Sequence, residues 1–201
     1  MFIICYVPRS KSSTSCVLLK LLMLSYSCTR SYTKPMTNPD RPPSFFFGYD
    51  LRTLAPLPDG SDPYVALLDD WPQHITAFPP VTELPGISPE PLFADVREIV
   101  HRSPVPIVVP SHDALFASEQ KVTVFDDLRH IHYALLGAVT AYGYADQYPA
   151  EYAGTDYNAH TSHMEGIVPP SAPIALTGLS VWRRNSAGQK YTFARYKFNT
   201  K

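Results

Sequence analysis

The alternation of apolar and polar residues predicts seven strands in this chain of 201 residues. Short apolar or alternating runs that end at proline, glycine or polar clusters are typical of strands. The first strand is expected to be buried, the second should end at Pro79-Pro80, and the last two should form a hairpin around residues 185–188. The seven strands are predicted at residues 64–68, 73–78, 105–109, 121–125, 157–163, 174–182 and 191–198.

Two further segments show the spacing of amphipathic helices. The first begins at Ser88-Pro89-Glu90, where serine is a favoured N-cap and proline suits the first helical position. The second follows Asp126-Asp127, which is expected to cap it, and a loop is expected at residues 143–157. Strands and helices in this mixed order predict an α+β fold. The predicted core positions are Leu92, Val96, Ile99 and Val100 in the first helix and Leu128, Ile131, Leu135 and Val139 in the second.

The first 35 residues differ in composition from the rest of the chain. They are basic, rich in serine and threonine, free of acidic residues, and contain all three cysteines and a short apolar run at 17–24. A targeting peptide has this composition, and a mis-assigned start with translation from Met36 is the equal alternative. We therefore predict an N-terminal extension at 1–35, a proline-rich lead-in with little regular structure at 36–62, and the folded domain at 63–201. A start at Met36 would imply a cytoplasmic protein, and otherwise the compartment stays open.

The charge balance narrows the kind of substrate. All 18 acidic residues but only 12 of the 17 basic ones lie at or after Met36, which gives this part a net charge of −6. Such a body is not a long basic groove for duplex nucleic acid, so a nucleic-acid substrate would be a short end or a small phosphodiester. The same part contains no cysteine, which excludes a thiolate nucleophile and a cysteine-based zinc site there. No apolar run approaches the ~18–20 residues of a membrane-spanning helix, so no membrane span is expected.

Two short segments share one pattern that bears on chemistry. His74-Ile75-Thr76 and His160-Thr161-Ser162 both read His-x-Thr/Ser, both lie in predicted strands, and they are 86 positions apart. Side chains alternate between the faces of a strand, so each imidazole points the same way as the hydroxyl two residues later. A lone motif of this kind is common, and a half-buried strand histidine with a satisfied hydrogen bond explains it. Two copies are much less expected by chance.

A pocket that holds two imidazoles and two hydroxyls suits phosphodiester chemistry. One neutral histidine can take a proton from the attacking hydroxyl or water, and the other, protonated, can give a proton to the leaving oxygen. Thr76 and Ser162 can hold the non-bridging phosphate oxygens. Because each proton transfer then has its own side chain, neither a metal nor another cofactor is required.

This tandem pattern resembles the signature of the two-histidine (2H) phosphoesterase superfamily, and in particular its 2'-5' RNA ligase-like family. The resemblance covers roughly residues 63–198. Ala159 stands where the family usually has proline, and Ser162 replaces the commoner threonine. Thr161 is polar where the family usually has an apolar residue, so the back of this strand is expected to be less buried. The segments that carry the resemblance are residues 70–76 for the first motif, 113–116 and 121–125 for the middle, 128–136 with His132 for the following helix, and 157–160 for the second motif.

The resemblance implies a bilobal α+β fold, with two antiparallel-sheet lobes, helices outside and a central cleft. It implies a metal-independent cyclic phosphodiesterase or 2'-5' RNA ligase-like phosphoesterase, with a hydrolase or ligase role in RNA processing. His74 and His160 would be catalytic, Thr76 and Ser162 would bind the substrate, and no metal or cofactor would be present. The substrate would be an RNA end or a small cyclic nucleotide, and the protein a monomer. The alternatives are a non-catalytic RNA-end or nucleotide-binding module on the same fold, and an unrelated α+β protein.

Other residue groups leave alternatives open. His130 and His132 lie two apart on a predicted helix, so they face different directions and make a poor metal pair. The late basic residues either contact substrate phosphates or form a solvated hairpin edge, and the second reading is favoured. Four tyrosines of the 143–157 region and its border either stack on bases or pack on the body, which is commoner. The basic residues are Arg183, Arg184, Lys190, Arg195 and Lys197, and the tyrosines are Tyr142, Tyr144, Tyr148 and Tyr152.

Overall fold

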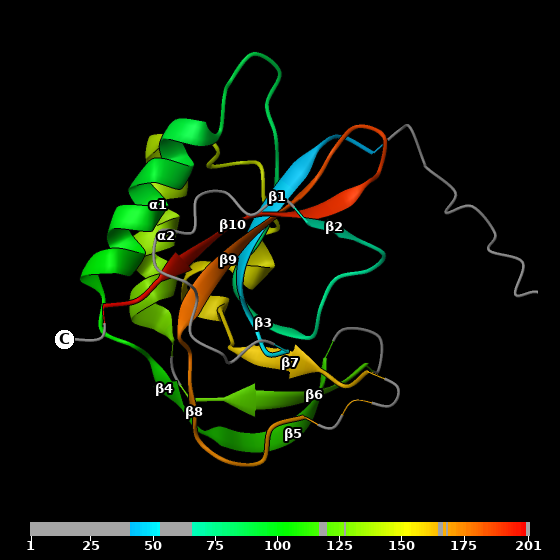
Figure 1. Cartoon of the computed structure of the whole chain (residues 1–201), viewed down its shortest axis with the longest axis vertical. Coiled ribbons are helices and arrows are strands. Elements are labelled where there is room, and N and C mark those ends of the chain that lie inside the picture. Colours follow the sequence, from blue (N-terminus) through cyan, green and yellow to red (C-terminus); the bar gives the residue numbers. More distant parts are fainter. Residues whose placement is uncertain are drawn as a thin grey trace, which may run out of the picture. The chain divides into compact units, whose positions relative to one another are not determined.

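A five-stranded antiparallel sheet in the order β2-β10-β9-β1-β3 is the larger of the two main sheets (Figure 1). The computed structural model describes residues 41–52, 66–116, 120–126, 128–164, 167 and 169–199, all of which belong to one compact unit, Met36–Lys201. The strands of this sheet are β1 (Ser44–Asp50), β2 (Ala66–Leu68), β3 (His74–Thr82), β9 (Gly178–Arg184) and β10 (Lys190–Lys197).

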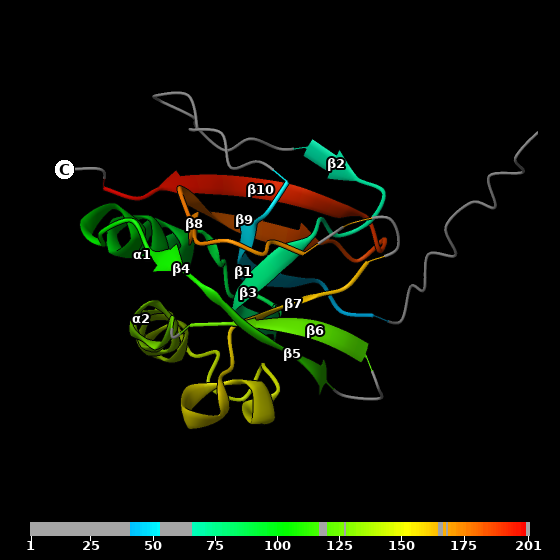
Figure 2. The same cartoon turned by 90° about the horizontal axis from the view of Figure 1, so that it is seen from below.

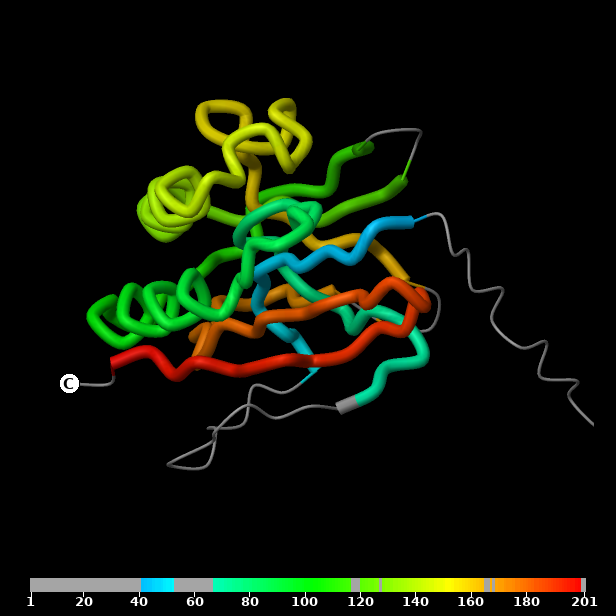
Figure 3. The backbone as a smooth tube through the Cα atoms, turned by 90° about the horizontal axis from the view of Figure 1, so that it is seen from above, coloured from blue at the N-terminus to red at the C-terminus, as the bar shows by residue number. Residues whose placement is uncertain are grey.

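The second sheet has three antiparallel strands in the order β5-β6-β7. Its last strand, β7, contacts β3 of the larger sheet, so the two sheets meet at the two strands that carry the His-x-Thr/Ser motifs. Figures 2 and 3 show the second sheet next to the larger one, with β7 on the side of β3. The strands are β5 (Pro110–Phe116), β6 (Gln120–Phe125) and β7 (His160–Ser162), and a small two-stranded sheet joins β4 (Ile107–Val108) to β8 (Ile174–Ala175).

Two helices, α1 (Glu90–Arg102) and α2 (Arg129–Ala141), lie side by side and in contact (Figures 1 and 2). Helix α1 packs on β10 and β9, and α2 packs on β3. Two short 3₁₀ helices, η1 (Ala150–Tyr152) and η2 (Gly154–Asp156), occupy the predicted loop. Neither α1 nor α2, within the described ranges, is long and apolar enough to cross a membrane. The fold is α+β with two antiparallel sheets, as predicted.

The apolar stripes of both helices form the core between helices and sheets. Leu92, Val96 and Val100 of α1 are fully buried, and so are the equivalent positions of α2, Ile131, Leu135 and Val139. Both helices begin without a side-chain cap from any described residue. The Ser88 hydroxyl, which was predicted to cap α1, instead donates to the Glu90 carboxylate, and Pro89 occupies the N-cap position of α1.

The predicted lead-in at 36–62 is wrong for the residues that form β1. This strand lies inside the larger sheet, between β9 and β3. Phe45, Phe46 and Phe47 are 1%, 6% and 0% exposed, so both faces of the strand are covered. A strand that is buried on both faces does not alternate between apolar and polar residues, so the period-two pattern of a strand is missing. The surrounding prolines also favoured the prediction of an irregular segment. Residues 36–40 and 53–62 of the predicted lead-in lie outside the described residues.

Other strand predictions also differ from the structure. The single strand predicted at 174–182 is two strands, β8 and β9, which belong to different sheets. Strand β3 continues through Pro79-Pro80 to Thr82, because it is the last strand of its sheet and the pairing with β1 shifts register opposite these prolines. Strand β2 was expected to be buried, but it also ends the sheet and Leu67 is 74% exposed. Strand β5 was not predicted, since its Ser111-His112-Asp113 segment is polar and exposed.

Candidate active site

One pocket of about 200 Å³ is lined by both His-x-Thr/Ser segments. β3 contributes His74 and Thr76, and β7 contributes His160 and Ser162. The structure therefore brings together the four residues that the sequence singled out. The pocket is completed by Asp70, Trp71, Pro72, Gln73, Gln120, Thr161 and Met164.

The two motif segments show the same pattern of burial. In each, the histidine and the hydroxyl residue are half-buried, and the residue between them is buried. Ile75 is 0% exposed and Thr161 is 1% exposed. The expectation that Thr161 would mark a less buried face is therefore wrong. The alternation places the imidazole and the hydroxyl of each strand on the same face.

The two imidazole rings are oriented in the same way. The Nδ1 of His74 lies 2.6 Å from the carbonyl oxygen of Pro72, and the Nδ1 of His160 lies 2.8 Å from that of Asn158. In both cases the carbonyl belongs to the residue two positions earlier. A carbonyl oxygen can only accept, so each Nδ1 carries a hydrogen and donates it. Nε2 is consequently the nitrogen that each ring can use toward a ligand.

The His74 ring packs against two aromatic side chains, Phe46 of β1 and Trp182 of β9, which we call the aromatic floor. Its ring centroid lies 5.3 Å from those of both Phe46 and Trp182. Gly48 leaves room for this arrangement, because a Cβ there would lie 2.6 Å from the Trp182 ring and 2.9 Å from the Ile75 carbonyl oxygen. The sequence prediction missed this floor, because it treated the β1 residues as a lead-in.

Burial is the main influence on the protonation of His74. Desolvation lowers the pKa of His74, whereas the hydrogen bond to the Pro72 carbonyl and the Asp50 carboxylate act to raise it. The nearby His160 lowers the pKa of His74 further. The net effect is a pKa below the ordinary value of 6.5. His74 is therefore neutral near pH 7, which is the state that a general base requires.

A third histidine, His132 of α2, is hydrogen-bonded to β3 on the side where α2 packs, and we call this contact the brace of β3. It is fully buried, its Nε2 accepts from the Gly154 backbone N–H at 2.8 Å, and its Nδ1 donates to the Ala77 carbonyl at 3.0 Å. The Tyr157 ring stacks on it at 4.0 Å, and the Tyr157 hydroxyl donates to the Thr76 carbonyl at 2.9 Å. The consecutive carbonyls of Thr76 and Ala77 in β3 therefore accept hydrogen bonds from outside their sheet, one from Tyr157 and one from His132. Sequence analysis placed His132 on the helix but did not assign it this function.

Among the described residues, no lysine or arginine side chain contributes to the lining of the pocket. Lys190 pairs with Asp70 and lies 5.3 Å from the centre of the Trp71 ring, so it supports two lining residues from outside. Arg183 binds the Glu83 carboxylate through two bonds of 2.9 Å and also contacts Glu90. The Arg183 side chain is 15% exposed and does not line the pocket, so for Arg183 both the substrate-phosphate contact and the solvated hairpin edge are wrong.

No group of three or more His, Cys, Asp or Glu side chains that could hold a metal ion occurs in the part of the chain that the structure describes. His130 is exposed and His132 is buried, so these two histidines of α2 face different surroundings, as their spacing predicted.

The fold and the pocket define an α+β protein in which each of two sheets supplies one His-x-Thr/Ser strand to a shared site. No protein-family model and no curated protein matches the chain. Among solved structures, the chain is similar to E. coli LigT complexed with 3'-AMP, with 14% identity and a TM-score of 0.46. It is also similar to TT0787 of Thermus thermophilus, with 13% identity and a TM-score of 0.49, and to a phosphoesterase, with 12% identity and a TM-score of 0.48. Each alignment covers 79% of this chain and 99% of the other.

Proposed function

We propose that this protein is a metal-independent phosphoesterase of the two-histidine type. Its substrates would be 2',3'-cyclic phosphates or 2'-5' phosphodiesters of RNA ends or small nucleotides. The observation that carries the proposal is the shared pocket, in which two imidazoles and two hydroxyls from separate sheets line about 200 Å³ of space.

His74 would act as the general base in hydrolysis of a cyclic phosphate. Its lowered pKa keeps it neutral near pH 7, and its Nδ1 is tied to the Pro72 carbonyl. Its Nε2 would take a proton from water as the water oxygen forms a bond to phosphorus. His160, when protonated, would give the proton on its Nε2 to the ribose oxygen as the bond between that oxygen and phosphorus breaks. The product is a phosphomonoester, and exchange of protons with solvent restores both rings.

Thr76 and Ser162 would bind the non-bridging phosphate oxygens through their hydroxyls. Both lie two residues after a catalytic histidine and line the same pocket. A phosphodiester carries one negative charge, and a protonated His160 balances it. This agrees with a lining to which no described lysine or arginine contributes.

The test is hydrolysis of adenosine 2',3'-cyclic phosphate in the presence of a chelator. The His74→Ala and His160→Ala variants should each lose at least about 10²-fold in kcat, because each removes one proton-transfer group. His101→Ala is the matched control, since His101 lies exposed on α1 and does not line the pocket. Circular dichroism should confirm that all variants are folded.

Two results would contradict the proposal. Full activity in both histidine variants would remove the catalytic roles. Tight nucleotide binding by the wild-type protein without turnover, at any pH between about 5 and 8, would identify a non-catalytic nucleotide-binding module instead.

A further inference from the structure

A second pocket of about 240 Å³ adjoins the first and shares His160 and Thr76 with it. We call it the Phe116 pocket. Its apolar wall consists of Phe116 at the end of β5, Tyr152 of η1, Tyr157, and the two prolines of β3, Pro79 and Pro80. A group bound here would touch the same histidine that faces the first pocket.

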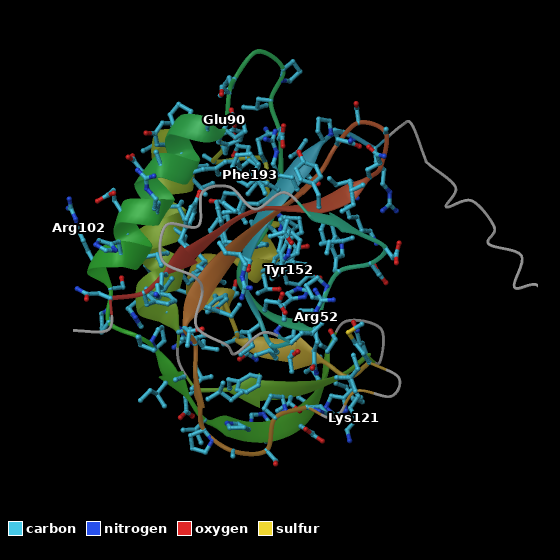
Figure 4. The ribbon with its side chains drawn as sticks, viewed as in Figure 1. Arg52, Glu90, Arg102, Lys121, Tyr152 and Phe193 are labelled. Atoms are coloured by element: carbon cyan, nitrogen blue, oxygen red, sulfur yellow. The ribbon has the colours of Figure 1, made fainter. Side chains whose placement is uncertain are left out.

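Phe116 and Tyr152 supply the flat faces of this pocket. The Phe116 ring lies 4.3 Å from the His160 ring, and the Tyr152 ring lies 5.5 Å from the Phe116 ring. Tyr152, which is labelled in Figure 4, is 37% exposed. Tyr157 is buried, and both its ring and its hydroxyl are engaged by His132 and Thr76. Phe116 and Tyr152 are therefore the two aromatic side chains of this pocket that keep accessible surface, since Phe116 is half-buried and Tyr152 is exposed.

The other three tyrosines that were considered for base stacking are engaged elsewhere. Tyr144 is 0% exposed, the Tyr142 hydroxyl donates to Asp95, and the Tyr148 ring packs on Phe78 at 5.0 Å. Of these four tyrosines, all in the described part of the chain, only Tyr152 lines this pocket. Tyr152 thus lines the Phe116 pocket, whereas the other three tyrosines are engaged by residues outside it.

Size and charge indicate what the pocket can hold. Its volume is below the ~300–1,000 Å³ of sites that enclose a drug-sized ligand, so it suits one flat ring system. Glu151, Asp156 and Asn158 form a polar rim, and no described lysine or arginine joins the lining. Carboxylates repel a further phosphate, and they accept hydrogen bonds from the amino groups of a base.

We propose that the Phe116 pocket binds the nucleobase of the substrate, stacked on Phe116 and Tyr152, while the phosphate lies between His74 and His160. The proposal rests on the proposed function and names the part of the substrate that the enzyme recognises. The acidic rim favours bases with an exocyclic amino group, namely adenine, cytosine and guanine, over uracil. It also disfavours a second phosphate on this side of the reacting one.

The test compares adenosine 2',3'-cyclic phosphate with the 2,3-cyclic phosphate of methyl ribofuranoside, which has no base. In the wild-type protein, the KM of the base-free compound should exceed that of the adenosine compound by about ten-fold, as expected for one stacked base. Tyr152→Ala should bring this KM ratio close to one, and Phe116→Leu should lower it. Leu115→Ala is the matched control on the same strand, because Leu115 is 72% exposed and does not line either pocket. It should keep the wild-type ratio.

A second variant tests the acidic rim. Asp156→Asn should reduce the preference for adenosine over uridine 2',3'-cyclic phosphate, since it removes the charge and offers an N–H in place of one acceptor oxygen. A wild-type KM ratio near one, or a ratio that Tyr152→Ala leaves unchanged, would overturn the proposal while the phosphoesterase activity stands.

A binding measurement separates failure of this inference from failure of the proposed reaction. If no phosphodiester is turned over, calorimetry with 3'-AMP and with ribose 3-phosphate reports on the pocket alone. Tighter binding of 3'-AMP that Tyr152→Ala abolishes would support the base site although the reaction had failed. Equal binding of both compounds would overturn the base site as well.

Discussion

The two motif strands carry the same residue pattern but differ in the support that surrounds them. β3 has nine residues, pairs along β1, rests on Phe46 and Trp182, and is braced by His132. β7 has three residues and pairs only with β6 among the described strands, with the Phe116 ring against its histidine. This difference teaches that two strands with the same motif can place their histidines in different surroundings. In the proposed reaction the general base is His74, whose pKa is lowered by desolvation.

The largest effect should follow from removing the brace behind β3. His132→Phe keeps an aromatic ring next to Tyr157 but leaves the Ala77 carbonyl and the Gly154 N–H without their partners. We expect a loss of about 2–4 kcal/mol in the free energy of unfolding, since each unsatisfied buried group costs about 1–3 kcal/mol. Urea denaturation measures it. His130→Phe, at an exposed position of the same helix, should change stability by less than about 0.5 kcal/mol.

The same variant should alter the pH dependence of stability. Burial lowers the pKa of His132 in the folded state, so the unfolded chain takes up a proton first as the pH falls below about 6.5. The wild-type protein should therefore lose stability as the pH falls through this range, and His132→Phe should show a shallower slope. An equal slope in both proteins would show that His132 does not contribute to it.

Gly48→Ala should disturb the floor under His74. The new Cβ would lie 2.6 Å from the Trp182 ring and 2.9 Å from a backbone oxygen. A backbone atom within a sheet cannot shift without a cost in free energy. We expect about 1–3 kcal/mol of destabilisation, as for overpacked cores, and a lower kcat because the His74 ring is displaced. Gly137→Ala is the control: nothing lies within 4 Å of that Cβ, and alanine in a helix interior should stabilise by about 0.5–1 kcal/mol. Thermal unfolding and kinetics of both variants decide the matter.

On β7 the expected stability effect is smaller and of opposite sign. The Thr161 hydroxyl is buried and has no hydrogen-bond partner among the described residues. Thr161→Val replaces it with a methyl group of similar shape, so the folded state no longer buries an unpaired hydroxyl. We expect unchanged or higher stability, by up to about 1 kcal/mol. Clear destabilisation in urea would mean that this hydroxyl has a partner in solution.

The smallest expected effect concerns the acid limb of the pH–rate profile. Activity should fall as His74 becomes protonated, so the limb in kcat/KM should lie below the ordinary histidine value of about 6.5. The Asp50 carboxylate raises the pKa of His74, so Asp50→Asn should move the limb to lower pH. A limb that stays in place, or moves to higher pH, would show that His74 is not the base.

The sequence predicted how the four motif residues are placed on their strands, but it did not predict the aromatic floor under His74 or the brace of β3 by His132. Period-two alternation was enough to place His74 with Thr76 and His160 with Ser162 on common faces, since it depends only on strand geometry. The floor and the brace depend on contacts between distant segments, such as Gly48 with Trp182 and His132 with Ala77. One signal for the brace was present: His132 lies four residues after Leu128 and three before Leu135, within the apolar stripe of its helix. A polar residue at such a position indicates a buried hydrogen bond.

The bond from each Nδ1 to the carbonyl two residues earlier has a consequence for substrate size. Because the acceptor belongs to the same segment as the ring, neither imidazole needs the opposite sheet to hold its direction. In the proposed reaction, a larger or smaller ligand would therefore leave both Nδ1 hydrogen bonds in place, even where it changed the spacing of β3 and β7. Under that proposal, substrates of different size would meet imidazole rings that keep the same direction.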